Sequence, residues 1–223
     1  RWAIAILRIK EFDIQGERTR VTFHQPESEL EFAHPWPQPV IDGEKGSSSF
    51  CLGNALRLLD TPGEWYQDYP SGQVYYWPRE GEDMLRAEVV APVVEKLITV
   101  DGSLERPVSH ITFKGIDFQH AGWYRPSLEG HVTLQGGMYL LDAYKLPIPG
   151  LPEKAELENQ AWIARPEAAV TVRGANHIDF RNCAFRHLGA TGLDYEWAVT
   201  DSEVKGCLFT DIGGTALALG AFP

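Results

Sequence analysis

The feature that most constrains the fold of this chain is an internal repeat. Three segments align position by position: residues 110–122, 177–189 and 201–213. The last two copies lie 24 residues apart, and Phe118, Phe185 and Phe209 share one column. Short strands broken by Gly or Asn turns at such a period are typical of a solenoid, in which each repeat stacks on the previous one.

We therefore predict an all-β chain that folds as a right-handed parallel β-helix. One turn of a solenoid cannot bury its inward side chains alone, so turns stacked about 4.8 Å apart form ladders of Phe, Cys and aliphatic residues. Cys183 and Cys207 share a column with Ile116, which indicates small core residues rather than disulfide or metal-binding cysteines. A β-sandwich is the competing all-β fold, but it produces no column alignment at a fixed period.

The repeat also predicts how the chain is organised. Residues 93–223 are expected to form the solenoid, and residues 123–167 interrupt it after the first copy. A loop of this length is usually a lid or a binding loop. Residues 1–92 are expected to form a β-rich region with a short helix at residues 50–59 and a hairpin at residues 63–78. Because a strand-like pattern runs into the last residues, we also expect the natural protein to continue.

Composition argues against several classes of function. The chain has 20 Lys and Arg residues and 31 Asp and Glu residues, and its net charge of -11 disfavours a nucleic-acid partner because phosphates are repelled. No stretch approaches the roughly 18 consecutive apolar residues of a membrane span. The sequence has no Walker-type glycine loop, no His-Glu-x-x-His zinc motif and no Gly-x-Ser-x-Gly elbow. We expect no cofactor, and no Asp-rich loop indicates calcium.

Two carboxylates, Asp194 and Glu196, lie two residues apart in a strand-like segment and are expected to share a face. If Leu193, Tyr195 and Trp197 point inward, both carboxylates lie on the outer face with Cα atoms about 6.7 Å apart. Glycoside hydrolysis needs a carboxylic acid and a second carboxylate, ~5–5.5 Å apart for retention and ~6.5–9.5 Å apart for inversion. The pair is a candidate for this chemistry, and a solvated strand face explains the same pattern.

A second candidate group is the column His120, His187 and Asp211, in which each residue lies two positions before a glycine. These side chains either border a substrate groove or form a structural ladder that satisfies backbone groups of the turns. We select Asp194 and Asp211 as the catalytic carboxylates, since the fold is expected to bring them close together, one turn apart. Glu196 is the substitute for either.

Aromatic residues in the interruption form a third candidate group. Sugar rings stack on Trp and Tyr faces through their apolar C–H surfaces, although the same side chains can instead hold the insertion against the solenoid. The aromatic residues of the hairpin at residues 63–78 are interpreted as packing. The residues that we expect to bind substrate are His120, Trp123, Arg125, Trp162 and His187.

Several segments resemble bacterial right-handed parallel β-helix proteins of the pectate-lyase-like, carbohydrate-active kind: residues 61–66, 75–78, 118–123, 158–162 and 187–195. Over roughly residues 50–223 the chain resembles glycoside hydrolase family 141, whose members are longer and act on plant cell-wall fucosides and xylans. The resemblance implies a glycosidase that acts on an oligo- or polysaccharide. It also implies a secreted or periplasmic protein, which we expect to be a monomer.

Two other functions stay open. A polysaccharide lyase abstracts a proton beside a uronate carboxylate and usually needs an Arg or Lys base or a metal. The predicted acidic face offers few such cations, so this alternative ranks lower. In a non-catalytic glycan-binding or adhesin-like solenoid, the aromatic residues alone would bind the glycan and the carboxylates would have no catalytic role.

Overall fold

The structure is a computed structural model that describes residues 4–33, 49–134, 137–141 and 163–220. Contacts divide the chain into two compact units, one formed by residues 1–39 and 91–223 and the other by residues 40–90. The boundary expected after residue 92 therefore lies close to the end of the second unit. The first 39 residues belong with the repeats rather than with the segment that follows them.

The second unit contains the predicted hairpin. Its described elements are a 3-10 helix (Leu56–Leu58) and the strands β3 (Trp65–Asp68) and β4 (Gln73–Tyr76). The strands pair antiparallel, and the amide of Gly72 closes the turn by donating to the carbonyl of Asp68 at 2.8 Å. Gly72 has a φ of 69°, a left-handed conformation that favours glycine. The helix expected at residues 50–59 shortens to the single 3-10 turn.

The first unit begins with a second hairpin and a helix. These elements are β1 (Ile9–Gln15), β2 (Arg18–Phe23) and α1 (Glu27–Ala33). The carboxylate of Glu27 is buried and accepts from the Nε of Arg8 at 2.7 Å, which compensates its burial. Leu30 packs in a small core with Val132 and Leu140, so α1 contacts residues of the predicted insertion.

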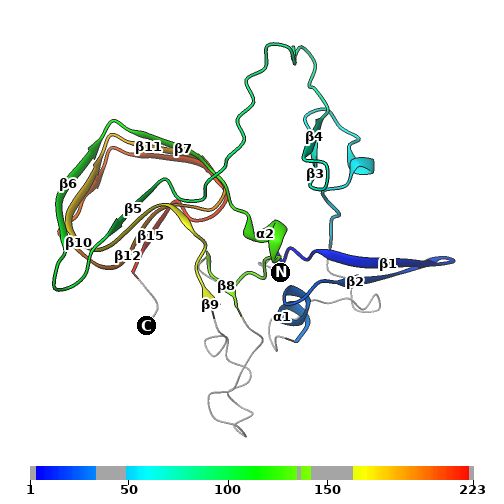
Figure 1. Ribbon diagram of the computed structural model, residues 1–223, viewed down its shortest axis with the longest axis horizontal. Coiled ribbons are helices and arrows are strands. Elements are labelled where there is room, and N and C mark those ends of the chain that lie inside the picture. The colour runs from blue at the N-terminus through cyan, green and yellow to red at the C-terminus, as the bar shows by residue number, and fades with distance from the viewer. Residues whose placement is uncertain (1–3, 34–48, 135–136, 142–162, 221–223) are drawn as a thin grey trace, which may run out of the picture. The chain divides into compact units, whose positions relative to one another are not determined.

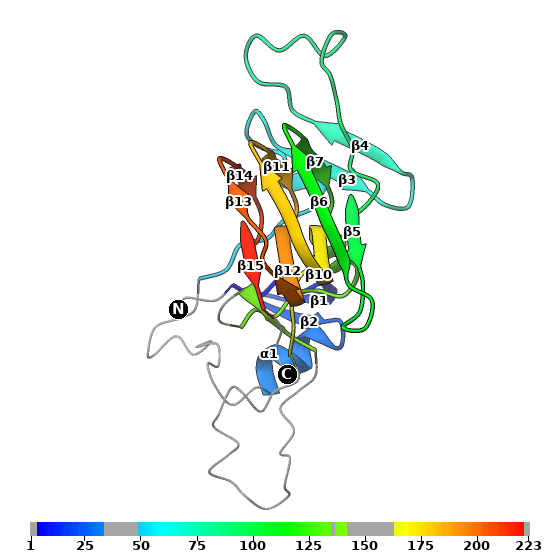
Figure 2. The ribbon, with the colours of Figure 1, turned by 90° about the vertical axis from the view of Figure 1, so that its left-hand side faces the viewer.

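The repeats form the rest of the first unit. Their strands are β5 (Ile98–Asp101), β6 (Val108–Lys114), β7 (Asp117–Ala121), β10 (Ala168–Arg181), β11 (Ala184–Leu188), β12 (Thr191–Thr200), β13 (Val204–Lys205), β14 (Leu208–Ile212) and β15 (Leu217–Leu219). We define the first rung as β5–β7, the second as β10–β11 and the third as β12–β14; β15 begins a fourth. Strands of neighbouring rungs pair in parallel. The rungs overlie one another in Figure 1 and lie side by side in Figure 2.

The strand register confirms the predicted columns. Phe185 lies opposite Phe118 on one side and Phe209 on the other. The ring centroids are 4.8 Å apart in the first pair and 4.7 Å apart in the second, and both pairs are stacked. Cys183 lies in the same core as a free thiol, and Cys207 packs against it from the third rung. The core of the first unit is therefore built by like residues stacking on like.

The glycines that end the second and third copies have a packing reason. A Cβ atom on Gly213 would lie 2.3 Å from the carbonyl oxygen of Gly189 on the rung before. A Cβ atom on Gly189 would lie 2.8 Å from the amide nitrogen of Trp123. At Gly189 and Gly213 no side chain fits, because the backbone of the neighbouring rung occupies the space.

The prediction that Trp197 points inward is wrong. Leu193 and Tyr195 are buried in the core as expected. The register between β10 and β12 then shifts by one residue, so that Glu196 is extra and Trp197 lies opposite Arg173. A β-bulge of this kind changes which residues share a face, and Trp197 is 37% exposed.

Candidate active site

The strand pattern predicted that Asp194 lies on an open outer face. Asp194 does lie on β12, but its side chain is covered and only 3% exposed. Its Oδ2 lies 3.2 Å from the Nε of Arg165. Among the described residues, its Oδ1 has no hydrogen-bond partner. Burial raises the pKa of Asp194 to about 6; the Arg165 guanidinium opposes this shift and the Glu196 carboxylate adds to it. A carboxyl group with such a pKa can hold a proton near neutral pH.

Arg165 reaches Asp194 from the end of the insertion. It directly follows β9 (Ile163–Ala164), which pairs with β8 (Tyr139–Leu140). Its Nη1 also donates to the carbonyl oxygen of Gly220 at 2.5 Å. The guanidinium group therefore connects Asp194 on the third rung to the segment after β15.

Glu196 belongs to a row of charges across three strands. Its Oε2 lies 3.6 Å from the Nη1 of Arg173 on β10. The Nε of Arg173 lies 3.1 Å from Oδ1 of Asp101 on β5. Glu196 is partly exposed and Asp194 is buried, so the two carboxylates have different environments on the same strand. Groups in this relation are candidates for an acid and its partner carboxylate.

Asp211 and Asp194 both belong to the third rung, but they lie on different sheets and have different partners. Asp211 is on β14 and its Oδ2 lies 2.6 Å from the Nδ1 of His187 on the second rung. The ring of His187 stacks on that of His120 at 5.4 Å. The column therefore exists as a continuous ladder, and its role as acid, base or substrate contact stays a prediction.

A matching ladder lies at another corner of the rungs. The ring centroids of His110 and His177 are 4.6 Å apart with the ring planes tilted by 31°, and Asp201 is the next residue of that column. All six residues of the two ladders have φ between 50° and 61°. His and Asp are enriched among the non-glycine residues that adopt this left-handed conformation. The recurrence gives the two ladders a shared structural reason, the left-handed backbone at each corner.

Trp123 and Arg125 lie in an aromatic cluster at the start of the insertion. The rings of Trp123 and His131 meet edge to face at 4.7 Å, and the Arg125 guanidinium lies 4.1 Å from the centroid of Tyr139. Burial, assisted by Arg125, lowers the pKa of His131 to about 4, so its ring is neutral at pH 7. Tyr139 pairs with Ala164, the residue before Arg165. Trp162, the remaining predicted contact, lies outside the described residues.

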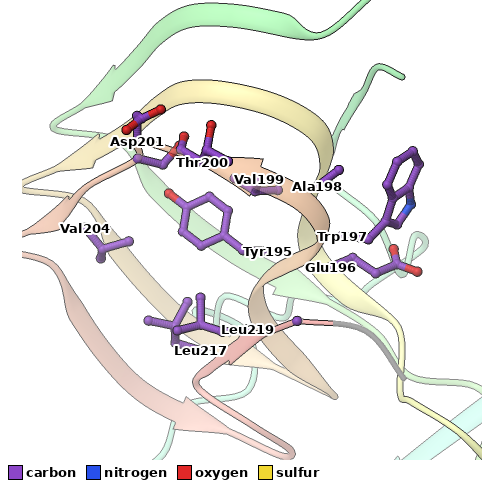
Figure 3. Close-up of a pocket in the computed structure, with 12 residues that line it drawn as sticks. Tyr195, Glu196, Trp197, Ala198, Val199, Thr200, Asp201, Val204, Leu217 and Leu219 are labelled. Atoms are coloured by element: carbon purple, nitrogen blue, oxygen red, sulfur yellow. The ribbon is translucent and has the colours of Figure 1, made fainter. Parts of the chain in front are cut away.

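A pocket of about 500 Å³ lies beside β12, the strand that carries Asp194, but its lining differs from that of the carboxylate site. In Figure 3 the side chains of Tyr195, Val204 and Leu217 point into it, and Glu196 and Trp197 lie at its margin. The Tyr195 hydroxyl donates to the carbonyl oxygen of Ile178 at 2.8 Å. The lining of this pocket is apolar around these three side chains, and Glu196 and Asp201 are the carboxylates that it includes.

In the described ranges, no three His, Cys, Asp or Glu side chains are grouped so that they could hold a metal ion. No helix within those same ranges has the length and apolarity to span a bilayer.

Sequence reasoning missed the two arginines of the site. Arg173 has a partial signal, because the 24-residue period aligns it with Trp197, the residue after Glu196. Arg165 has no such signal, since it precedes β10 and belongs to no column.

Two comparisons with known proteins found a match for this chain. The family model described as the GH141 insertion domain matches residues 1–79. A solved structure named glycoside hydrolase is 48% identical, with a TM-score of 0.89 over 99% of this chain. The chain spans 38% of the length of that structure. No curated protein matches. Along nearly its whole length, therefore, this chain is similar to part of a glycoside hydrolase.

Proposed function

We propose that this chain is part of a glycoside hydrolase and that Asp194 is its general acid. The observation that carries the proposal is a buried carboxyl group, its pKa raised to about 6, two residues from a second carboxylate. Strongly perturbed carboxyl groups are concentrated at catalytic sites. The similarity to a protein named glycoside hydrolase supports the same assignment.

In this proposal Asp194 protonates the glycosidic oxygen as the bond to the anomeric carbon breaks. Glu196 then either attacks the anomeric carbon or removes a proton from an attacking water molecule. In the first case, water later releases the sugar from Glu196, and Asp194 takes back a proton. Glu196 thus replaces Asp211 as the partner of Asp194, because it lies on the same strand and acts electrostatically on the Asp194 carboxyl group.

We also infer that the stacked rungs belong to a right-handed parallel β-helix of the pectate-lyase-like kind. The parallel pairing of equivalent residues in successive rungs supports this fold. Insertions in a solenoid tend to collect on its working face. The pairing of Tyr139 with Ala164 places described parts of the insertion next to Arg165, and hence next to Asp194.

The substrate in this proposal is a plant cell-wall or related polysaccharide. The contacts that we propose for it are the five residues selected from the sequence: His120, Trp123, Arg125, Trp162 and His187. The enzyme would be exported, would act as a monomer and would need no cofactor.

A lyase is the second candidate, because two cations lie beside the carboxylates. Arg165 contacts Asp194 and Arg173 contacts Glu196. A lyase would use one of them as a base on a uronate substrate. Both arginines are engaged in ion pairs, which favours hydrolysis.

The full-length protein should be screened on neutral and acidic plant glycans, with products identified by mass spectrometry and ultraviolet absorbance. We expect saturated products that have gained one water. Unsaturated, ultraviolet-absorbing products would replace the hydrolase with the lyase. Binding without turnover of any glycan would leave only the non-catalytic glycan-binding function.

The pH profile tests the role of Arg165. Since this guanidinium lowers the pKa of Asp194, Arg165→Gln should raise that pKa by about 1 unit. A general acid works when protonated, so activity falls as pH rises through its pKa. The alkaline limb of kcat/KM should therefore move to higher pH in the variant. Arg186→Gln removes an ion pair with Asp117 on the other sheet and should leave the limb in place. An unshifted limb in Arg165→Gln would show that another group is the acid.

A further inference from the structure

We propose that one face of the β3–β4 hairpin binds a neutral polysaccharide chain. This glycan-binding face lies in residues 40–90, outside the carboxylate site, and the inference goes beyond the proposed hydrolysis. Three aromatic residues form it: Tyr66, Tyr75 and Trp77. The hairpin is labelled in Figure 1.

The strand register places these three rings on the same face. Tyr66 lies directly opposite Tyr75, with ring centroids 6.0 Å apart and planes inclined by 26°. Trp77 follows Tyr75 by two residues, and its amide donates to the carbonyl of Glu64 at 2.9 Å, so the ladder continues past β4. Tyr75 is 38% exposed and Trp77 is 43% exposed. Such a row offers flat surfaces on which the C–H faces of successive sugars can stack.

A polar group lies beside the rings. The Tyr75 hydroxyl donates to Oε1 of Gln73 at 2.8 Å, which fixes both side chains on this face. Among the described residues, the side-chain nitrogen of Gln73, Nε2, has no hydrogen-bond partner. It is therefore free to donate to a sugar hydroxyl, and an aromatic face with a fixed amide suits an uncharged polyol.

The opposite face of the hairpin is occupied in part by its own chain. The Tyr76 hydroxyl donates to Oε2 of Glu82 at 2.5 Å, and the Nη1 of Arg79 lies 3.3 Å from the same hydroxyl. The Arg79 side chain also covers Gly63, where a Cβ atom would lie 2.6 Å from its Nε. Trp65 shares that face with Tyr76, and it is 63% exposed. It provides an exposed aromatic residue for comparison on the other side of the same two strands.

Charge selects the class of glycan. Residues 40–90 contain nine Asp and Glu residues against four Lys and Arg residues, a net charge of -5. Acidic polysaccharides such as polygalacturonate are repelled by such a surface, whereas neutral ones are not. The expected ligand is thus an uncharged backbone of the xylan, glucan or mannan kind.

The test is affinity electrophoresis of the whole chain in gels that contain xylan, xyloglucan, galactomannan or polygalacturonate. We expect retardation in at least one neutral gel and none in polygalacturonate. The double variant Tyr75→Ala/Trp77→Ala should bind about tenfold more weakly. The matched variant Trp65→Ala should bind within about twofold of wild type, because it changes only the other face. Near-ultraviolet circular dichroism and thermal unfolding check that each variant is folded.

Three results would overturn the proposal: no retardation in any neutral gel, retardation in polygalacturonate alone, or equal losses in Trp65→Ala and the double variant. Hydrolysis of a small aryl glycoside is measured in parallel with the full-length protein and should not change when that protein carries the double variant. Binding without hydrolysis would refute the proposed function and leave the glycan-binding face intact. Hydrolysis without binding would refute the glycan-binding face and leave the proposed function intact.

Discussion

Asp194→Asn is expected to lower kcat on natural glycans by roughly 10³-fold. The amide keeps the shape of the side chain and its place beside Arg165, but it cannot donate a proton to the glycosidic oxygen. Aryl glycosides whose leaving group needs no protonation, such as dinitrophenyl glycosides, should lose much less. Glu196→Gln should impair both kinds of substrate, because the second carboxylate acts whatever the leaving group. Steady-state kinetics on the two substrate types separates these roles.

Two further variants complete this test. Asp117→Asn removes another Asp that pairs with an arginine, on the three-stranded sheet, and should change kcat by less than about twofold. Asp211→Asn distinguishes the two carboxylate pairs. We expect Glu196→Gln to lower kcat strongly and Asp211→Asn to have little effect. The reverse result would make Asp211 the partner of Asp194. Full activity of a folded Asp194→Asn variant would remove Asp194 from the mechanism.

Phe185→Ala should lower the free energy of unfolding of the first unit by about 3–5 kcal/mol. Phe185 is completely buried and lies between the rings of Phe118 and Phe209. Removing the middle ring leaves a cavity that rungs held by parallel hydrogen bonds on both sides cannot easily close. Urea denaturation monitored by circular dichroism measures the loss.

The comparison for this variant is Phe12→Ala, on β1. Phe12 is largely exposed, so its replacement should cost less than about 0.5 kcal/mol. If Phe185→Ala cannot be purified folded, Phe185→Leu keeps most of the volume and should cost about 1 kcal/mol. A loss below about 1 kcal/mol for Phe185→Ala would mean that the phenylalanine column contributes little to the core.

The column of phenylalanines shows what a repeat reveals without coordinates. In parallel strands, equivalent residues of successive rungs become neighbours, so the period alone predicts that Phe118, Phe185 and Phe209 stack. Gly189 and Gly213 at the ends of the second and third copies follow from the same period, because the backbones of successive rungs approach each other there. Helix α1 (Glu27–Ala33) was missed, since seven residues outside the repeat carry too little periodicity to identify a helix.

The sequence by itself determined the stacking of the rungs and the presence of two carboxylates on one strand. Only the tertiary structure decided that Asp194 is buried, that its partner is Arg165 and that Trp197 faces outward. Alternation along a strand specifies its two faces, but it does not specify which segment covers the outer one or where a bulge reverses the alternation. The pKa of Asp194 depends on that covering segment, because burial and one guanidinium group from the end of the insertion act on it in opposite directions.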